Sequence, residues 1–276
     1  MSDPAEQAPK NEVDDSPLSP EMDVAMSIWE HLDEFRKRLV NAAIAVMITS
    51  ILCWVYKEQI LAALSAPYIQ QWHLANMPGE PELQSVAMAG TFTSYMRQSL
   101  TCGIVLSVPV IFYQLWAFIS PGLYAKEKRF IVPFVLFSSF LFLSGVAFAY
   151  KIAFPFSTQY FFSLAGKVGS SGLVVTQRPT FDEFLDFTTT LHLIFGGIFE
   201  LPILIMFLVI AGIVTRPQLW KFSRWAVFAS IALGAIVTPG GDVMFQMLVA
   251  GALSALYFTS ILLSYLVANV KKAPSP

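Results

Sequence analysis

Charged residues are scarce in this chain, and the sequence lacks the motifs of several common classes of protein. Asp, Glu, Lys and Arg make up 13% of the 276 residues, whereas a soluble domain carries roughly a quarter. The sequence contains no basic block interleaved with aromatic residues, which is the pattern that would suggest nucleic-acid binding. No phosphate-binding GxxxxGK[ST] motif occurs, so nucleotide-driven chemistry has no support. These deficits argue against a soluble, nucleic-acid-binding or nucleotide-hydrolysing protein.

Metal and thiol chemistry have as little support. None of the three histidines, His31, His73 and His192, has a second ligand at metal-binding spacing, and the two cysteines form no CxxC pair. Cys53 and Cys102 lie in apolar runs, where packing as small hydrophobic residues is the first interpretation and a mutual disulfide the alternative. No nucleophile–base pair stands out, so we expect neither an enzyme nor a cofactor.

Apolar segments dominate the chain. Hydrophobic residues make up 55% of it, including 24 Phe. Six segments are long enough, or nearly so, to cross the hydrocarbon core as helices: about 39–56, 100–119, 130–150, 187–214, 222–238 and 243–268. The fifth is short, which requires a thinner bilayer or an incomplete crossing. The turn signature at 238–242 predicts a tight hairpin between the last two. The sequence therefore predicts an all-α integral membrane protein with six transmembrane helices.

The two ends differ from the apolar body. Residues 1–25 are acidic and rich in Pro, a composition that cannot bury a core and is typical of a disordered tail. They lack the basic start and short apolar run of a cleavable signal peptide. We therefore expect a disordered tail over 1–25, a six-helix transmembrane domain over 26–270 and a short cytoplasmic tail over 271–276.

The distribution of Lys and Arg predicts the orientation. Most flank one side of the six spans, and an excess of Lys and Arg in short loops marks the cytoplasmic face. The larger group comprises Arg36, Lys37, Arg38, Lys126, Lys128, Arg129, Arg216, Lys221, Arg224, Lys271 and Lys272; the smaller comprises Lys57, Arg97, Lys151, Lys167 and Arg178. Both termini are therefore expected in the cytoplasm. The outside segments, about 57–99 and 151–186, are expected to form ordered caps containing short helices.

One carboxylate, Glu200, lies in the middle of the fourth apolar segment, directly before Leu201-Pro202. An ionisable group near the bilayer midplane is costly and usually functional. Gly196 and Gly197, one turn earlier, allow close approach of another helix, and Pro202 is expected to kink the span. The alternative is a protonated Glu hydrogen-bonded inside a packed bundle. Gln246, one turn into the last span, is a weaker candidate for contacts between helices.

Two further carboxylates lie on the expected cytoplasmic side. Residues 27–39 form an amphipathic pattern that runs into the first span, with Glu34 on its polar face. From spacing alone, Glu34 pairs with Arg38 four residues later. Glu127 stands among three cations after the second span, where pairing with Lys128 is the simplest interpretation.

Several motifs, taken in order, resemble the TatC family, the multi-spanning receptor subunit of the twin-arginine protein translocase. They are His31-Leu32-x-Glu34-Phe35-Arg36-x-Arg38-Leu39, Ser65-Ala66-Pro67, Gln114-x-Trp116-Ala117-Phe118, Pro121-x-Leu123-Tyr124-x-x-Glu127, Phe199-Glu200-Leu201-Pro202 and Thr238-Pro239-Gly240-Gly241-Asp242. The resemblance covers about residues 27–268. Phe35 departs from the Leu that is commoner in the family, which leaves the polar face unchanged.

The resemblance implies a concave, glove-like bundle in the bacterial inner membrane that recognises the paired arginines of signal peptides on folded cargo. Glu34 and Glu127 would engage the arginine pair, with Phe118 holding the apolar residues that follow and Arg36 completing the signal-peptide site. A carboxylate accepts a guanidinium through two bonds, which Lys cannot reproduce. Pro67 and Asp242 would shape the outside caps.

The resemblance also implies partners. Small single-span proteins of the TatA and TatB type would dock a polar group at Glu200, self-association is expected, and the proton-motive force would drive export. The alternative function is a proton-coupled transporter of a small solute with Glu200 as the proton carrier. No internal repeat supports that alternative, and it leaves the amphipathic helix that carries Glu34 without a task.

Overall fold

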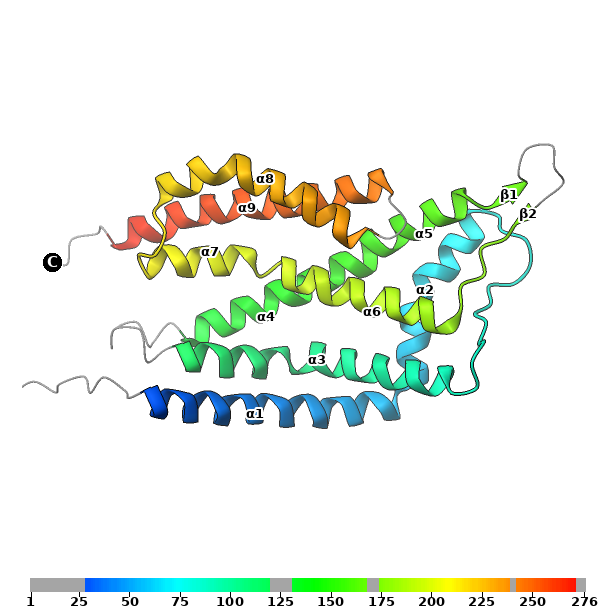
Figure 1. The fold of residues 1–276 in the computed structure, drawn as a ribbon, viewed down its shortest axis with the longest axis horizontal. Coiled ribbons are helices and arrows are strands. Elements are labelled where there is room, and N and C mark those ends of the chain that lie inside the picture. Colours follow the sequence, from blue (N-terminus) through cyan, green and yellow to red (C-terminus); the bar gives the residue numbers. More distant parts are fainter. Residues whose placement is uncertain (1–27, 120–130, 168–173, 239–241, 272–276) are drawn as a thin grey trace, which may run out of the picture.

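The structure is a computed structural model that describes residues 28–119, 131–167, 174–238 and 242–271. Nearly all of it is helical (Figure 1). In chain order the elements are α1 (Ile28–Val55), α2 (Lys57–Leu74), α3 (Gly90–Ile119), α4 (Ile131–Phe148), the π-helix η3 (Ala149–Ala153), α5 (Phe154–Ser163), β1 (Gly166–Lys167), β2 (Val174–Val175), α6 (Phe181–Ile198), α7 (Leu201–Ile210), α8 (Arg216–Val237) and α9 (Val243–Lys271). The two short strands pair antiparallel.

Within these residues, six helical segments are long and apolar enough to cross a membrane. They are α1, α3, the continuous path α4–η3–α5, the pair α6–α7, α8, and α9 up to Tyr265. The predicted all-α membrane fold with six spans is thereby confirmed. The amphipathic stretch before the first span continues into it without a break, because α1 includes both.

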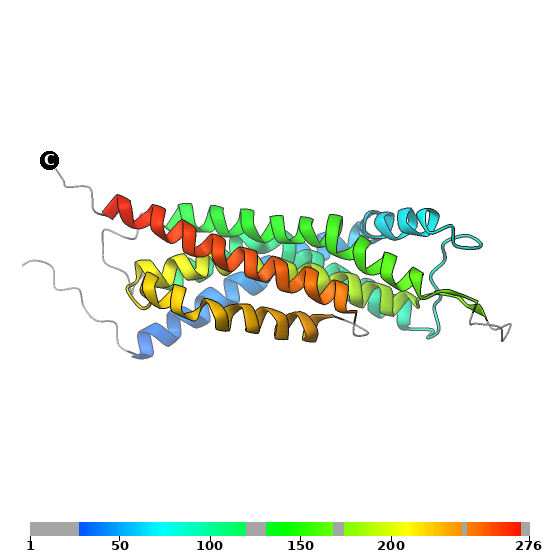
Figure 2. The same cartoon turned by 90° about the horizontal axis from the view of Figure 1, so that it is seen from above.

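The helices form a curved wall. From one edge to the other its order is α1, α3, α4, then α6 with α7, and finally α9 and α8 (Figure 1). Figure 2 shows α1 and α8 displaced to the same side of α4, so that the wall is concave. The first turn of α1 and the last turn of α9 lie at the same end of the bundle (Figure 1). That arrangement is compatible with the predicted cytoplasmic location of both termini.

The outside caps are shorter than the sequence predicts. The second span begins at Gly90 and the fourth at Phe181, both inside segments assigned to the caps. The predicted starts of these two spans were too late because polar side chains before them were assigned to the caps. In the structure these side chains face other helices. Ser94 donates to Asp182 on α6, and Gln98, fully buried, donates from Nε2 to the Lys57 carbonyl at 3.0 Å. The caps do contain the expected short helix, α2.

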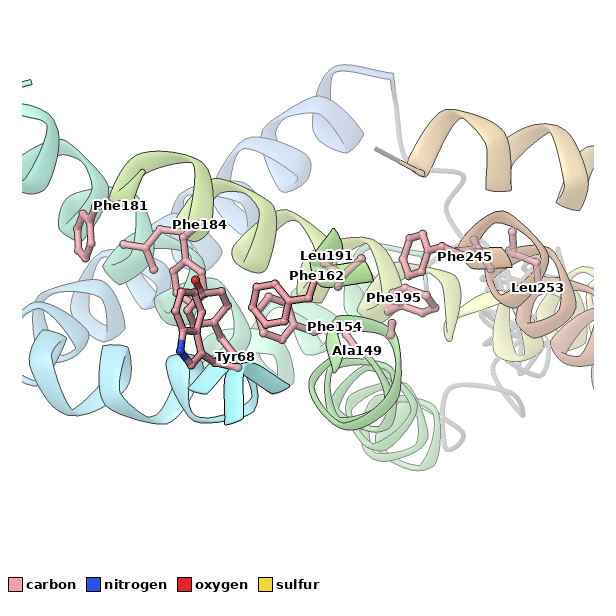
Figure 3. Packing of buried hydrophobic residues seen from close by; sticks show 14 residues of the cluster. Tyr68, Ala149, Phe154, Phe162, Phe181, Phe184, Leu191, Phe195, Phe245 and Leu253 are labelled. Carbon is pink, nitrogen blue, oxygen red and sulfur yellow. The ribbon is translucent and has the colours of Figure 1, made fainter. Parts of the chain in front are cut away.

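The core is strongly aromatic at the end of the bundle nearest α2. Rings from α2, α5 and α6 meet edge to face (Figure 3); the members are Tyr68, Trp72, Phe154, Phe162 and Phe184. Ala149 and Ala153 of the π-helix are completely buried against this cluster. The aromatic cluster holds α2 and α5 on α6.

Both cysteines, Cys53 on α1 and Cys102 on α3, carry free thiols. The disulfide left open by the sequence is therefore absent, and the packing interpretation stands. Beside them, the Thr49 hydroxyl of α1 donates to the Gly103 carbonyl of α3 at 2.8 Å. A Cβ at Gly103 would overlap Ser50, so this glycine is what allows α1 and α3 to pack closely.

Candidate functional site

Glu34 is held in an ion pair at the end of the bundle that carries both described termini. Arg38, one turn later on α1, donates to Oε1 of Glu34 from Nη2 at 2.9 Å and from Nε at 3.3 Å. Its Nη1 also reaches Oε1 of Gln114 on α3 at 3.5 Å. The pairing expected from spacing is therefore formed. The Glu34–Arg38 ion pair is partly shielded from solvent, since the Glu34 side chain is 19% exposed.

The second oxygen of Glu34 has no partner in the described part of the chain. Oε2 is buried and makes no hydrogen bond there, although a buried carboxylate oxygen normally has a donor. Because Arg38 takes only Oε1, Glu34 can accept a further donor at Oε2 without giving up its partner on α1. The site thus combines a pre-oriented carboxylate with one unused acceptor.

An aromatic stack lies beside the Glu34 pair. Phe118, near the end of α3, stacks on His31 with centroids 4.5 Å apart and planes at 19°. It also meets Phe35 at 5.3 Å. His31 and Phe35 are one turn apart on α1 and so share a face. His31 was not among the predicted site residues, although its spacing of four from Phe35 is the signal that would have found it.

The other predicted signal-site residues are less informative. Arg36 is exposed and, being two residues from Glu34, projects from another side of α1. Glu127 lies outside the described residues, so its expected role with Glu34 in engaging the arginine pair stays a prediction. Gln114, absent from the predicted site, joins it through its bond to Arg38.

Glu200 lies where the fourth span is interrupted. Helix α6 ends at Ile198 and α7 begins at Leu201, because Pro202 has no N–H to continue the bonding pattern of α6. Gly196, buried, accommodates the ring of Phe142 on α4, which a Cβ would overlap. The interruption and the close contact of α4 together turn the Glu200 side chain toward α4.

The carboxylate of Glu200 joins a polar chain that crosses three helices. It is in hydrogen-bonding contact with the Ser138 side chain and the Phe142 backbone of α4. Ser138 is fully buried and accepts at Oγ from the indole Nε1 of Trp116 on α3 at 3.2 Å. Oε1 of Glu200 is buried without a partner among the described residues. Neither Trp116 nor Ser138 was a predicted site residue, since nothing in their spacing relates them to Glu200.

The remaining predicted residues have structural contacts. Gln246 of α9 donates from Nε2 to the Ile231 carbonyl of α8 at 3.3 Å, so it does join two helices. Asp242 is buried, and its Oδ1 accepts the Met244 N–H at 2.8 Å at the start of α9. Pro67 is buried inside α2. In the described residues, no group of three or more His, Cys, Asp or Glu is placed to hold a metal ion.

Fold and site together define a multi-pass helical membrane protein with one carboxylate at the bundle end and another inside the bundle. Residues 30–251 match the family model described as Sec-independent protein translocase protein (TatC). The chain therefore belongs to the TatC family. It is a component of the Tat protein-transport system, not an enzyme.

Relatives and solved structures agree with this assignment. The chain is 36% identical to TatC of Desulforapulum autotrophicum, over 84% of this chain and 82% of that one. It is 33% identical to TatC of Aquifex aeolicus, over 90% and 98%. A crystal structure of the twin-arginine translocase receptor TatC in DDM superposes with a TM-score of 0.73 and 34% identity, covering 85% of this chain and 99% of that one.

Proposed function

We propose that this protein is the receptor that binds the Arg-Arg pair of signal peptides on folded cargo at the cytoplasmic face of the bacterial inner membrane. The observation that carries the proposal is the unused Oε2 of Glu34, next to the stack of His31, Phe35 and Phe118. One guanidinium donates to Oε2 while Arg38 keeps Oε1 occupied. The apolar residues that follow the arginines pack on Phe118.

A second acceptor completes the recognition. Two adjacent arginines in an extended segment point to opposite sides, so a single carboxylate does not serve both. Glu127, which follows α3, is the second acceptor in this proposal, and Arg36 contributes to the rim of the site. Both termini lie in the cytoplasm, in keeping with the Lys and Arg distribution.

The intramembrane site has a different role in this proposal. Single-span partners of the TatA and TatB type dock a polar group on Oε1 of Glu200, which lacks an internal partner in the described residues. Leaving such a group unpaired costs about 1–3 kcal/mol, so a partner's donor stabilises the complex. The assembled complex, containing further copies of this chain, exports cargo at the expense of the proton-motive force.

The test is binding of purified protein to a fluorescent Arg-Arg signal peptide beside a Lys-Lys peptide of equal charge. A preference of about tenfold or more for Arg-Arg is expected, because the planar guanidinium presents several N–H donors in a fixed arrangement that the ammonium of Lys does not reproduce. Glu34→Gln and Glu127→Gln should each abolish the preference. Asp33→Gln, an exposed neighbour on α1, is the matched control. Equal binding of both peptides by the unmodified protein would reduce the contact to general electrostatics and overturn the proposal.

A further inference from the structure

An apolar groove lies between α7, α8 and α9. Its volume is about 750 Å³, and α7, α8 and α9 line it with residues that include Ile205, Trp225, Leu233 and Leu253. Helix α7 presents Ile205 to this groove, whereas Glu200 directly before α7 contacts α4. Leu201, next to Glu200, borders the groove, but the Glu200 side chain is not part of its lining.

Two cations stand at one end of the groove. Lys221 and Arg224, both exposed, line it on the first turns of α8. Neither has an ion-pair partner in the described part of the chain. Arg216, at the start of the same helix, is instead placed over the Tyr265 ring at 5.1 Å. The groove therefore combines an apolar channel with two cations, Lys221 and Arg224, that have no ion-pair partner in the described residues.

The short uncharged part of α8 places Lys221 and Arg224 at the level of the lipid headgroups. From Trp225 to Val237 the uncharged part of the helix rises about 20 Å, against a hydrocarbon core of about 30 Å. Such a mismatch thins the local bilayer, which brings headgroups to the depth of Lys221 and Arg224.

The extent of the groove fits one leaflet. Along α8 its lining runs from Gln218 to Leu233. From Arg224 to Leu233 it rises about 14 Å, which does not cross even a bilayer thinned to about 20 Å. A membrane-spanning helix would require a groove over the full height of the bundle. A lipid, with a charged head and a chain one leaflet long, matches both ends.

We propose that this groove binds an anionic phospholipid, with its phosphate on Lys221 and Arg224 and one acyl chain along α8 toward Leu233. Basic residues between transmembrane helices on the cytoplasmic side suit anionic headgroups. The lipid fills the space between α7 and α8 and fixes the α8–α9 hairpin against α7. The proposal does not depend on signal-peptide recognition.

Native mass spectrometry of the detergent-purified full chain tests it, by titration with dioleoyl phosphatidylglycerol and separately with dioleoyl phosphatidylcholine. The first phosphatidylglycerol should bind more tightly than phosphatidylcholine. Lys221→Gln with Arg224→Gln should weaken phosphatidylglycerol binding about fivefold for each cation removed, and bring it to the level of phosphatidylcholine. Lys37→Gln with Arg216→Gln removes the same charge outside the groove lining and should leave the preference unchanged.

A third variant tests the acyl-chain channel. Ala229 is exposed and lines the groove, so Ala229→Trp fills it without disturbing the core. It should weaken binding of both lipids. Equal affinity of the unmodified protein for the two lipids, or equal losses in the groove and control double variants, would overturn the proposal. Unchanged lipid binding in Ala229→Trp would overturn it as well. If this variant kept its lipid and instead lost binding of a single-span partner, the groove would be assigned to a membrane-spanning helix.

Discussion

The indole nitrogen of Trp116 and the hydroxyl of Ser138 are 3.2 Å apart, and through this bond α3 orients a serine that contacts Glu200 from α4. A hydroxyl can accept one bond and donate another. Ser138 and the Phe142 backbone therefore hold the Glu200 carboxylate toward α4, while Oε1 has no partner in the described structure.

Replacing Ser138 with Ala should impair export and loosen the bundle. The substitution leaves the Trp116 N–H without its acceptor and removes one of the two α4 partners of Glu200, which keeps the Phe142 backbone. We expect this to lower the free energy of unfolding by about 1–3 kcal/mol. Ser139→Ala is the matched control, because among the described residues the Ser139 side chain bonds only back to the Val135 carbonyl of its own helix. Thermal unfolding in detergent and an export assay measure the two effects. Equal behaviour of the two variants would contradict a positioning role for Ser138.

Changing Glu200 itself should separate peptide binding from assembly. Glu200→Ala should bind an Arg-Arg peptide normally, because Glu200 belongs to a different site from Glu34. It should recover less single-span partner on co-purification and reduce export at least tenfold. Glu200→Gln keeps an oxygen acceptor and gains a donor, so we expect partial retention of both. Normal export by Glu200→Ala would return the residue to a purely structural role.

Much of this architecture could be predicted from the sequence, because apolar run length decides membrane spans almost regardless of context. The six spans, the interruption beside Pro202 and the Glu34–Arg38 pair all follow from local patterns. Span ends were less predictable where polar residues such as Gln98 find partners on other helices. A sequence pattern shows that such a residue is polar, and only the packing shows that it is buried.

The parts of the site that the sequence missed are contacts between distant segments. His31 meets Phe118 across α1 and α3, and Trp116 reaches Glu200 only through Ser138. No local spacing relates His31 to Phe118 or Trp116 to Glu200, so only the arrangement of the helices shows that they are connected. Glu127 is the opposite case, because the sequence identifies it as a site residue but it lies outside the described residues.

The aromatic stack should contribute to peptide affinity. Phe118→Ala removes the ring on which we propose that an apolar peptide residue packs. One such contact is worth about 0.5–1.5 kcal/mol, so we expect the Kd for an Arg-Arg peptide to rise about three- to tenfold. Tyr113→Ala is a suitable control, because Tyr113 is an exposed aromatic residue on the same helix with no ring contact in the described structure. Fluorescence anisotropy with the labelled peptide measures both. Similar affinities in the two variants would remove Phe118 from the site.

Close packing of α4 on α6 should be sensitive to a single methyl group at Gly145. A Cβ there would overlap the Phe195 carbonyl, a backbone atom that has little freedom to move, and would also press on Phe199 beside Glu200. Overpacking of this kind costs typically about 1–3 kcal/mol. Gly145→Ala should therefore lower thermal stability and, by separating α4 from the interruption, weaken the Ser138–Glu200 contact and export. Gly251→Ala adds the same methyl group to α9 in open space and should be neutral or slightly stabilising, since Ala favours helices. If Gly145→Ala were as stable and active as Gly251→Ala, the close contact of α4 with α6 would not be what positions Glu200.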